Sequence, residues 1–492
     1  MITWAGITTS NLEFVNTIQS FNNIDEDNNG FYKVIKSNGA LEFFVSVDGD
    51  DLNDGLTPLT AFKTAAKAEE MARDGFADII RFRCGEDFTV DGTTVFNDMK
   101  SGKSLNEPRV ISTYDDHLGV RPVIDVISFN QTSDVKRFIS VIGVQYPEGG
   151  SGSRVTMIAD TDGIHFEDCV FSRVEFTMQN GKNFSYIRNI GYGAYHDGTS
   201  TSSDSRPSQL FVNNTDGLNI VGNVFDQGGW SPDVFGAGAN LYNHNVYLQT
   251  DVNGFRLSFV NNISTRASAH SAQLRSGGIA NYNFAGRCAV GMTLGYATTA
   301  MLDGVPCYDF NSVSSEGYSM MKGAEQDPQN PDGLVACTVG GLCTGALWGS
   351  WISLHGNADY KQYSCVSSKL ADDDNLSFPT GLIRIKRSFY VSDDFGIPDS
   401  ALDVQNIAAY HWVTPTEGDD DGYTDPDRTL GTYYQFLLSQ GLTPAAGDDD
   451  FDSFMNIAKS RLRGQWDERV SAKEIVKYIQ AGYDVPEYII GD

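Results

Sequence analysis

The chain has 492 residues, and its 35 basic and 64 acidic side chains give a formal net charge of −29. A chain this acidic is not expected to bind nucleic acid or an anionic membrane surface, because both attract basic proteins. Charged residues make up 20% of the chain and glycine contributes 50 residues, a composition that suits short strands and turns better than long helices.

Residues 1–40 form a polar N-terminal segment with the character of a leader or attachment piece. This segment lacks the basic stretch and the apolar run of a secretory signal, so we expect synthesis without a signal peptide. No part of the chain approaches the roughly 18 consecutive apolar residues of a transmembrane helix, so membrane insertion is not expected.

A capping element is predicted at the start of the next region. The pattern is a strand near residue 41, an acidic turn at 48–55, a short helix over 61–71 and a second strand. Phe62, Ala65 and Ala66 have the i, i+3, i+4 spacing of one helix face. Because alanine side chains are small, this helix face can lie close to the strands, and Phe62 could fill the open end of the stack of strands.

From about residue 105 to 400, short β-runs recur at intervals of about 20 to 26 residues, which predicts a repeat architecture. The runs LNIVGNVF, RLSFVNNI and GIANYNF place Asn223, Asn262 and Asn283 at equivalent turns. Identical buried asparagines can stack from coil to coil and satisfy the polar groups of the turns, as in parallel β-helices.

A second alignment matches HNVYLQ (244–249) with HSAQLR (270–275) and VGMTLG (290–295). Because side chains alternate along a strand, one set of positions faces inward and the other outward. His244 and His270 begin successive strands. The predicted inward columns are Val246, Ala272 and Met292, and Leu248, Leu274 and Leu294. The predicted outward columns are Tyr247, Gln273 and Thr293, and Gln249, Arg275 and Gly295.

Residues 411–492 combine an acidic loop with helical periodicity, and Ser471 with Glu474 fits a helix capping box. This helical tail is expected either to cover the open end of the coils or to form a small packed appendage.

The segment FFVSVDGDDLNDGLTPLTAFKTAAKA resembles the opening of right-handed parallel β-helix proteins of the pectate-lyase-like superfamily. The runs HNVYLQ and RASAHSAQLRSGG, and the tail RGQWDERVSAKEIVKYIQAGYD, are similar to segments of β-helix proteins of bacteria and their phages. The resemblance implies a mainly β fold, a right-handed, single-stranded parallel β-helix over residues 41–410, with a short N-terminal segment and a helical C-terminal tail.

Within that superfamily the chain looks most like a bacteriophage tailspike depolymerase. The resemblance implies an acidic bacterial capsular polysaccharide or exopolysaccharide as partner. It also implies a homotrimer attached to a phage tail, acting outside the host cell. The sequence departs from the pattern in one respect, because it has no distinct C-terminal β-domain of the kind that often supports such trimers.

A long connection before the second of the aligned regions should overhang the outer groove. This connection, at 228–243, carries Trp230, Asp233 and Tyr242, and Asp226 directly precedes it. Glycoside hydrolysis needs two carboxyl groups, one as acid and one as nucleophile or base. Asp226 and Asp233 are therefore the candidate catalytic pair of the first hypothesis.

In this hydrolase hypothesis His244 and His270 complete the catalytic set, where they tune the carboxyl groups or hold substrate. The residues assigned to substrate binding are Arg275, Gln273, Tyr247, Trp230, Tyr242 and Arg266.

The alternative hypothesis is a polysaccharide lyase that acts by β-elimination on a uronate. Arg275 or Arg266 would neutralise the carboxylate, and a histidine or Tyr247 would remove the C5 proton. A non-catalytic receptor-binding fibre, or a secreted bacterial enzyme of the same fold, remains a further alternative. The reserve residues are Glu316, Glu325 and the pair His196–Asp197.

No cofactor is predicted to be required. Aspartate-rich stretches at 48–55, 417–427 and 447–452 could hold structural calcium, but they lack the spacing of a complete calcium loop and read more simply as acidic turns.

Overall fold

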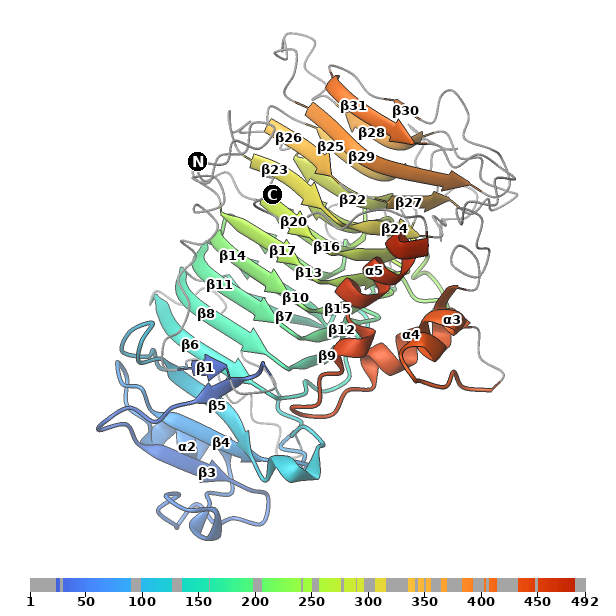
Figure 1. The fold of residues 1–492 in the computed structure, drawn as a ribbon. Helices are drawn as coiled ribbons and strands as arrows, with labels where there is room; N and C mark the ends of the chain where they lie inside the picture. The colour runs from blue at the N-terminus through green and yellow to red at the C-terminus, as the bar shows by residue number, and fades with distance from the viewer. Residues whose placement is uncertain are drawn as a thin grey trace.

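The chain is wound into coils, most of which contain three short strands separated by sharp turns. Equivalent strands of successive coils pair in parallel, so the fold is a parallel β-helix (Figure 1). The computed structural model describes residues 30–89, 99–125, 135–158, 160–197, 206–239, 242–249, 256–275, 278–288, 290–295, 306–315, 432–446 and 450–482, together with strand backbones at 24–26 and between 335 and 413.

The strands form three faces, which we call sheets 1, 2 and 3. Sheet 1 begins with β3 (Glu42–Val45), β4 (Ile79–Arg83), β5 (Arg109–Tyr114) and β6 (Lys136–Ile142). It continues with β8 (Thr161–Glu167), β11 (Gly181–Ile187), β14 (Asp216–Val221), β17 (Leu257–Val260), β20 (Gly278–Asn281), β23 (Pro306–Phe310) and β26 (Thr344–Trp348). Sheet 2 contains β9 (Val170–Ser172), β12 (Ile190–Tyr192), β15 (Val224–Asp226), β18 (Ile263–Thr265), β21 (Phe284–Gly286), β24 (Val313–Ser315) and β27 (Trp351–Leu354).

Sheet 3 is the face that carries most of the candidate residues. It contains β7 (Arg154–Met157), β10 (Glu175–Gln179), β13 (Ser208–Asn213), β16 (His244–Gln249), β19 (His270–Leu274), β22 (Val290–Gly295), β25 (Val335–Gly340), β28 (Ser364–Lys369) and β30 (Leu402–Asp403). The long strand β29 (Ile383–Ser392) pairs with both β26 and β27, and β31 (Ile407–Val413) follows it.

The predicted register of the aligned coils is confirmed. Val246 pairs with Ala272 and Ala272 with Met292, while the Leu248 column and the Tyr247 column align in the same way. Val246, Ala272 and Leu248 are buried in one apolar core that runs through the coils. Aromatic rings stack along this core, with centroids 4.5 Å apart for Tyr146 and Phe171 and 6.0 Å apart for Tyr186 and Phe225.

The asparagine ladder is also confirmed, and it is longer than predicted. The Asn262 side chain accepts hydrogen bonds from the backbone and side-chain N–H groups of Asn223, at 3.0 and 2.9 Å. Asn283 accepts from Asn262 in the same way, and Asn223 accepts from the backbone of Asn189. The ladder therefore satisfies the buried turns between sheets 1 and 2 in successive coils.

The N-terminal end of the core is closed by Phe62 and helix α2 (Ala65–Met71). Phe62 is fully buried and its ring centroid lies 5.7 Å from that of Phe43. The predicted core-facing side of this helix is wrong at one residue, Ala66. The helix begins at Ala65, directly after its N-cap Thr64, and not at residue 61. Ala65 and Ala68 therefore face the core, and Ala66 is exposed.

The helical tail contains α3 (Thr432–Ser439), α4 (Asp450–Lys459) and α5 (Ala472–Gly482). It lies along the side of the β-helix against sheet 2 (Figure 1), so it is a packed appendage rather than a cover of the open end. The Glu474 N–H donates to Ser471 Oγ at 3.3 Å, which is one of the two bonds of the predicted capping box, while the Ser471 N–H donates to the backbone oxygen of Glu468.

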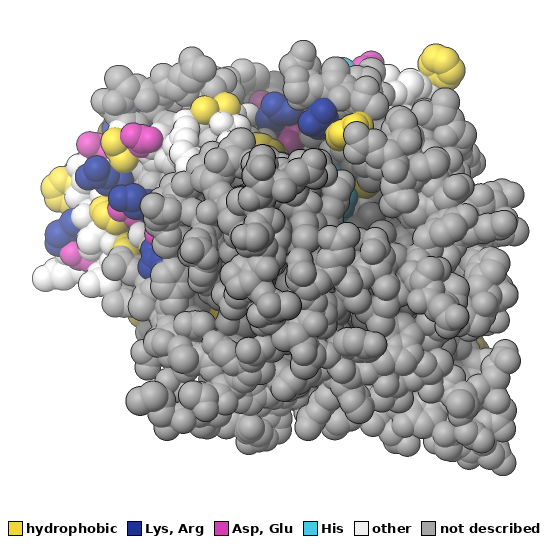
Figure 2. All heavy atoms as spheres, turned by 90° about the horizontal axis from the view of Figure 1, so that it is seen from above, with side chains coloured by type: hydrophobic (Ala, Val, Ile, Leu, Met, Phe, Trp, Pro, Cys, Tyr) yellow, Lys and Arg dark blue, Asp and Glu magenta, His cyan; other side chains and the backbone are white. Residues whose placement is uncertain are grey.

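The described part of the N-terminal segment also packs on the β-helix. Strand β1 (Ile24–Glu26) pairs antiparallel with β2 (Tyr32–Val34), and Tyr32 and Val34 contact Ile142 of β6. Seen from the top of the stack, the described surface shows basic side chains beside acidic ones with single apolar side chains between them (Figure 2). No described helix is long and apolar enough to cross a membrane.

Candidate functional site

The outward side chains of sheet 3 form a partly buried row of aromatic and amide groups. In register, Phe211 on β13 lies beside Tyr247 on β16, which lies beside Gln273 on β19. The rings of Phe211 and Tyr247 stack with centroids 5.3 Å apart and an interplanar angle of 20°. Flat apolar rings next to amides are suited to sugar rings, which present C–H faces and hydroxyl edges.

Arg275 completes this row just beyond the end of β19. Its Nη1 donates to the Tyr247 hydroxyl and, at 2.9 Å, to Gln249 Oε1. The Tyr247 hydroxyl also donates to Gln249 Oε1 at 2.7 Å, and the guanidinium carbon lies 5.6 Å from the Tyr247 ring centroid. Both of these acceptors are uncharged, and the two contacts fix the position of the guanidinium.

His244 and His270 meet where β16 and β19 begin. Their Nδ1 atoms are 3.1 Å apart, a contact in which one ring donates and the other accepts. His244 is buried and stacks on Tyr247 with ring centroids 5.5 Å apart. Burial, together with the nearby His270 and Arg275, holds the pKa of His244 well below its usual value. The pair therefore includes a neutral imidazole beside the Tyr247–Arg275 contact.

The structure places Asp226 away from sheet 3, underneath the helical tail. Its carboxylate accepts from Arg266 Nε at 2.8 Å, from Lys459 Nζ at 2.6 Å and from the Thr265 hydroxyl. Burial alone would raise the pKa of Asp226, but the charges and hydrogen bonds of Arg266 and Lys459 lower it to about 2. These contacts are those of a structural carboxylate, so Asp226 takes no part in the function proposed below.

Arg266 and Trp230 belong to the same structural region. Arg266 bridges Asp226 and, at 2.7 Å, Asp452 of α4, while its backbone oxygen accepts from Trp230 Nε1 at 2.8 Å. Asp233 lies on the exposed part of the overhanging connection. The candidate carboxylate pair is thus divided between a buried ion cluster and an exposed loop.

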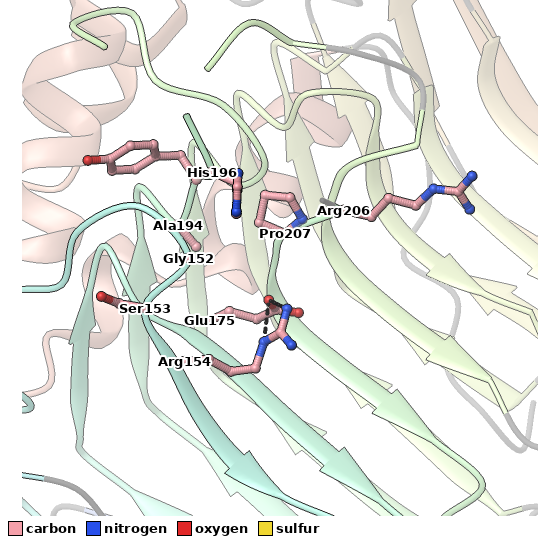
Figure 3. A pocket seen from close by; sticks show the side chains of 9 residues that line it. Gly152, Ser153, Arg154, Glu175, Ala194, His196, Arg206 and Pro207 are labelled. Atoms are coloured by element: carbon pink, nitrogen blue, oxygen red, sulfur yellow. Dashed lines mark hydrogen bonds and ion pairs between the residues drawn. The ribbon is translucent and has the colours of Figure 1, made fainter. Parts of the chain in front are cut away.

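A pocket that the sequence analysis did not identify lies at the starting edge of sheet 3 (Figure 3). Arg154 and Glu175 form one side of it, paired across β7 and β10, and the reserve residue His196 lies on the other side. Arg206 also lines the pocket, and its guanidinium carbon lies 4.5 Å from the centroid of the Tyr242 ring. The sequence gives one signal for Arg154 and Glu175, which is that both residues occupy outward positions in the short β-runs RVTM and EFTMQ.

The aspartates of the 48–55 turn bind their own backbone. Asp50 and Asp54 accept from N–H groups two residues ahead, both at 3.0 Å, and Asp51 accepts from the N–H of Thr64 at the start of α2. Among the described residues no three His, Cys, Asp or Glu side chains gather as metal ligands would. The acidic stretch 417–427, residues 447–449, and both Glu316 and Glu325 lie outside the described residues.

Comparison with known proteins gives no matching family model and no matching curated protein. Among solved structures, the chain is similar to pectate lyase Pel9A, with 14% identity, a TM-score of 0.41, and coverage of 80% of this chain and 84% of that one. A rhamnogalacturonan lyase matches with 14% identity, a TM-score of 0.34, and coverage of 69% and 89%. The lacto-N-biosidase of family GH136 from Eubacterium ramulus matches with 11% identity, a TM-score of 0.28, and coverage of 76% and 67%. Likeness at this level says nothing of activity, which has to be argued from the side chains of this chain.

Proposed function

We propose that this protein binds an acidic bacterial polysaccharide across the outer face of sheet 3 and cleaves it by β-elimination at a uronate. The observation that carries the proposal is the contact of the Arg275 guanidinium with the Tyr247 hydroxyl on an aromatic, partly buried sheet face. A guanidinium binds a carboxylate in two parallel hydrogen bonds and withdraws charge from the carbon next to it.

The chemistry assigns one step to each group. Arg275 binds the uronate carboxylate, which makes the C5 proton more acidic. The Tyr247 oxygen, which lies against the same guanidinium, takes that proton as a phenolate, after its own hydroxyl proton has passed to water, and His270 is the second candidate base. The C5–H electron pair forms the C4=C5 double bond as the C4–O4 bond breaks, and O4 leaves with a proton. Water is not consumed.

We prefer β-elimination to hydrolysis because one of the two carboxyl groups of the hydrolase hypothesis is buried and already bound in an ion cluster. Asp226 is held by Arg266 and Lys459 beneath the tail, and Asp233 is exposed on a loop. A hydrolase would need both within about 5 to 10 Å on either side of one glycosidic bond. The tailspike setting, the homotrimer and a structural calcium ion remain predictions of the sequence.

The test is incubation with polygalacturonate, alginate, xanthan, gellan and exopolysaccharides of candidate host bacteria, while reducing ends and the ultraviolet absorbance of unsaturated uronate are followed together. We expect both signals to rise with one of these polymers. Reducing ends without the absorbance would mean hydrolysis. Binding with neither signal would leave a receptor-binding fibre.

A further inference from the structure

The pocket at the starting edge of sheet 3 is built by four separate segments of the chain. Residues 152–154 precede or begin β7, Glu175 begins β10, residues 194–196 follow β12, and residues 206–207 precede β13 (Figure 3). His244 and His270 begin β16 and β19 at the same edge. The pocket therefore continues the proposed site along the axis of the β-helix.

The register gives the distance between the two regions. Phe176, directly after Glu175, pairs with Leu210, which pairs with Val246. Glu175 is thus two strands away from β16 and three from β19. At about 4.8 Å between neighbouring strands, this corresponds to about 10 to 15 Å across the sheet. Arg275 lies four residues further along the direction of β19, or about 13 Å at 3.3 Å per residue, so the pocket is roughly 20 Å from Arg275, which a few linked sugar rings can span.

One wall of the pocket is an ion pair that presents a donor next to an acceptor. The Glu175 side chain is 6% exposed and accepts from Arg154 Nε at 2.9 Å and Nη2 at 2.8 Å. The Arg154 side chain is 45% exposed, and a guanidinium has five N–H donors. The charges of the pair cancel, so this wall suits the hydroxyl groups of an uncharged sugar better than a carboxylate.

The opposite wall is His196, held at two points. Its Nδ1 lies 3.5 Å from Asp197 Oδ1, and its Cδ2 would lie 3.3 Å from a Cβ added at Gly152. The ring thus packs closely over a residue that has no side chain. Figure 3 shows His196 facing the Arg154–Glu175 pair across Pro207, while the Arg206 side chain points away from the pocket.

From this arrangement we propose that the pocket, with room of about 10 Å³, is a second carbohydrate subsite, which takes a hydroxyl group of an uncharged sugar unit in the same polysaccharide whose uronate is bound at Arg275. The inference rests on the proposed function and narrows it. The substrate is a heteropolymer, in which a neutral sugar lies a few units away from the uronate that is cleaved. Arg154, Glu175 and His196 are binding residues of this subsite and take no part in the chemical step.

The experiment compares H196A and E175Q with the wild type by native electrophoresis in gels that contain a polysaccharide. Xanthan and gellan combine glucuronate with neutral sugars, whereas polygalacturonate and alginate consist of uronates. We expect each variant to bind the heteropolymers about tenfold more weakly, as the loss of one or two hydrogen bonds implies. Binding to the uronate homopolymers should not change. For a heteropolymer that is cleaved, KM should rise and kcat should not.

The matched controls are H117A, on the exposed turn at 116–118, and E70Q, whose carboxylate is exposed on α2. H196A removes a partly exposed ring and should keep the wild-type Tm. If E175Q folds poorly, H196A alone therefore tests the subsite. Equal binding of the heteropolymers by wild type and both variants overturns the subsite, as does a lower kcat with unchanged KM. Lack of retardation of the wild type by every polymer overturns it too. Retardation that H196A weakens, without any cleavage, upholds the subsite and refutes the elimination proposal alone.

Discussion

Arg275 is held by hydrogen bonds from one nitrogen, Nη1, which donates to both Tyr247 and Gln249. Lysine keeps the charge but cannot bind a carboxylate with two parallel bonds. We therefore expect R275K to lower kcat/KM by about 10 to 100-fold, which corresponds to roughly 1.5 to 3 kcal/mol for a charged hydrogen bond. The measurement is the initial rate of unsaturated-uronate formation, with R137K, at an exposed arginine, as control. A rate equal to that of the wild type would exclude Arg275 from the site.

Asp226 illustrates a second residue-scale effect, a buried charge that stabilises the fold. We expect D226N to reduce the free energy of unfolding by about 3 to 5 kcal/mol, because Arg266 and Lys459 would lose their shared buried partner. Since folding lowers the pKa of Asp226 from 3.8 to about 2, the part of its stabilising effect that depends on ionisation is complete above pH 4 and is lost as the pH falls through 2. Urea unfolding should show the difference between wild type and D226N shrinking by about 2 kcal/mol over that range. D233N, at an exposed carboxylate, should match the wild type throughout.

At the scale of the element, the asparagine ladder links turns that are 21 to 39 residues apart in sequence. The Asn262 side chain accepts from Asn223 and donates to the backbone oxygen of Ile220 at 3.0 Å. We expect N262A to cost about 2 to 4 kcal/mol, because it leaves these buried groups without partners. Chemical denaturation measures the loss, and N106A on an exposed turn is the control. Equal stability of N262A and N106A would show that water replaces the side chain.

Those elements that are fixed by residues close together in the chain could be predicted from the sequence. The register of β16, β19 and β22 follows from alternation within three aligned runs, and the ladder follows from repeated asparagines at turns. The face of α2 was misjudged by one position, because the N-cap at Thr64 sets where the helix begins and thus which alanine faces the core. The Arg154–Glu175 pair was missed because β7 and β10 lie outside the runs that align cleanly.

At the scale of the whole molecule, the position of the tail could not be read from local patterns. Lys459 is 233 residues away from Asp226, and Arg463 is 295 residues away from Asp168, with which it pairs at 2.9 Å. The sequence contains the apolar stripe of sheet 2, but no periodicity indicates which segment covers it. For the same reason the sequence alone does not show that Asp226 lies between two cationic partners, Arg266 and Lys459.

The tail covers an outward stripe of sheet 2 that is apolar in coil after coil. Phe284 lies 6.0 to 6.1 Å, centroid to centroid, from Phe454 and Tyr433 of the tail, and both contacts are edge-to-face. The buried apolar side chains of the stripe are Val170, Ile190, Val224, Ile263, Phe284 and Val313. Each contributes roughly 1.5 to 3 kcal/mol by its burial, so an uncovered stripe would be a large apolar patch.

A chain that ends at Val413 should therefore keep its coils but associate through sheet 2. Size-exclusion chromatography at increasing concentration would measure this association, and we expect soluble aggregates at micromolar concentrations. The control is the same truncated chain with V224T and I263T, which reduce the apolar patch without changing the interior columns. If the truncated chain eluted at the same position and had the same Tm as the full chain, the tail would have no structural role. Its apolar contacts with sheet 2 and its ion pairs with Asp168 and Asp226 all argue for the opposite result.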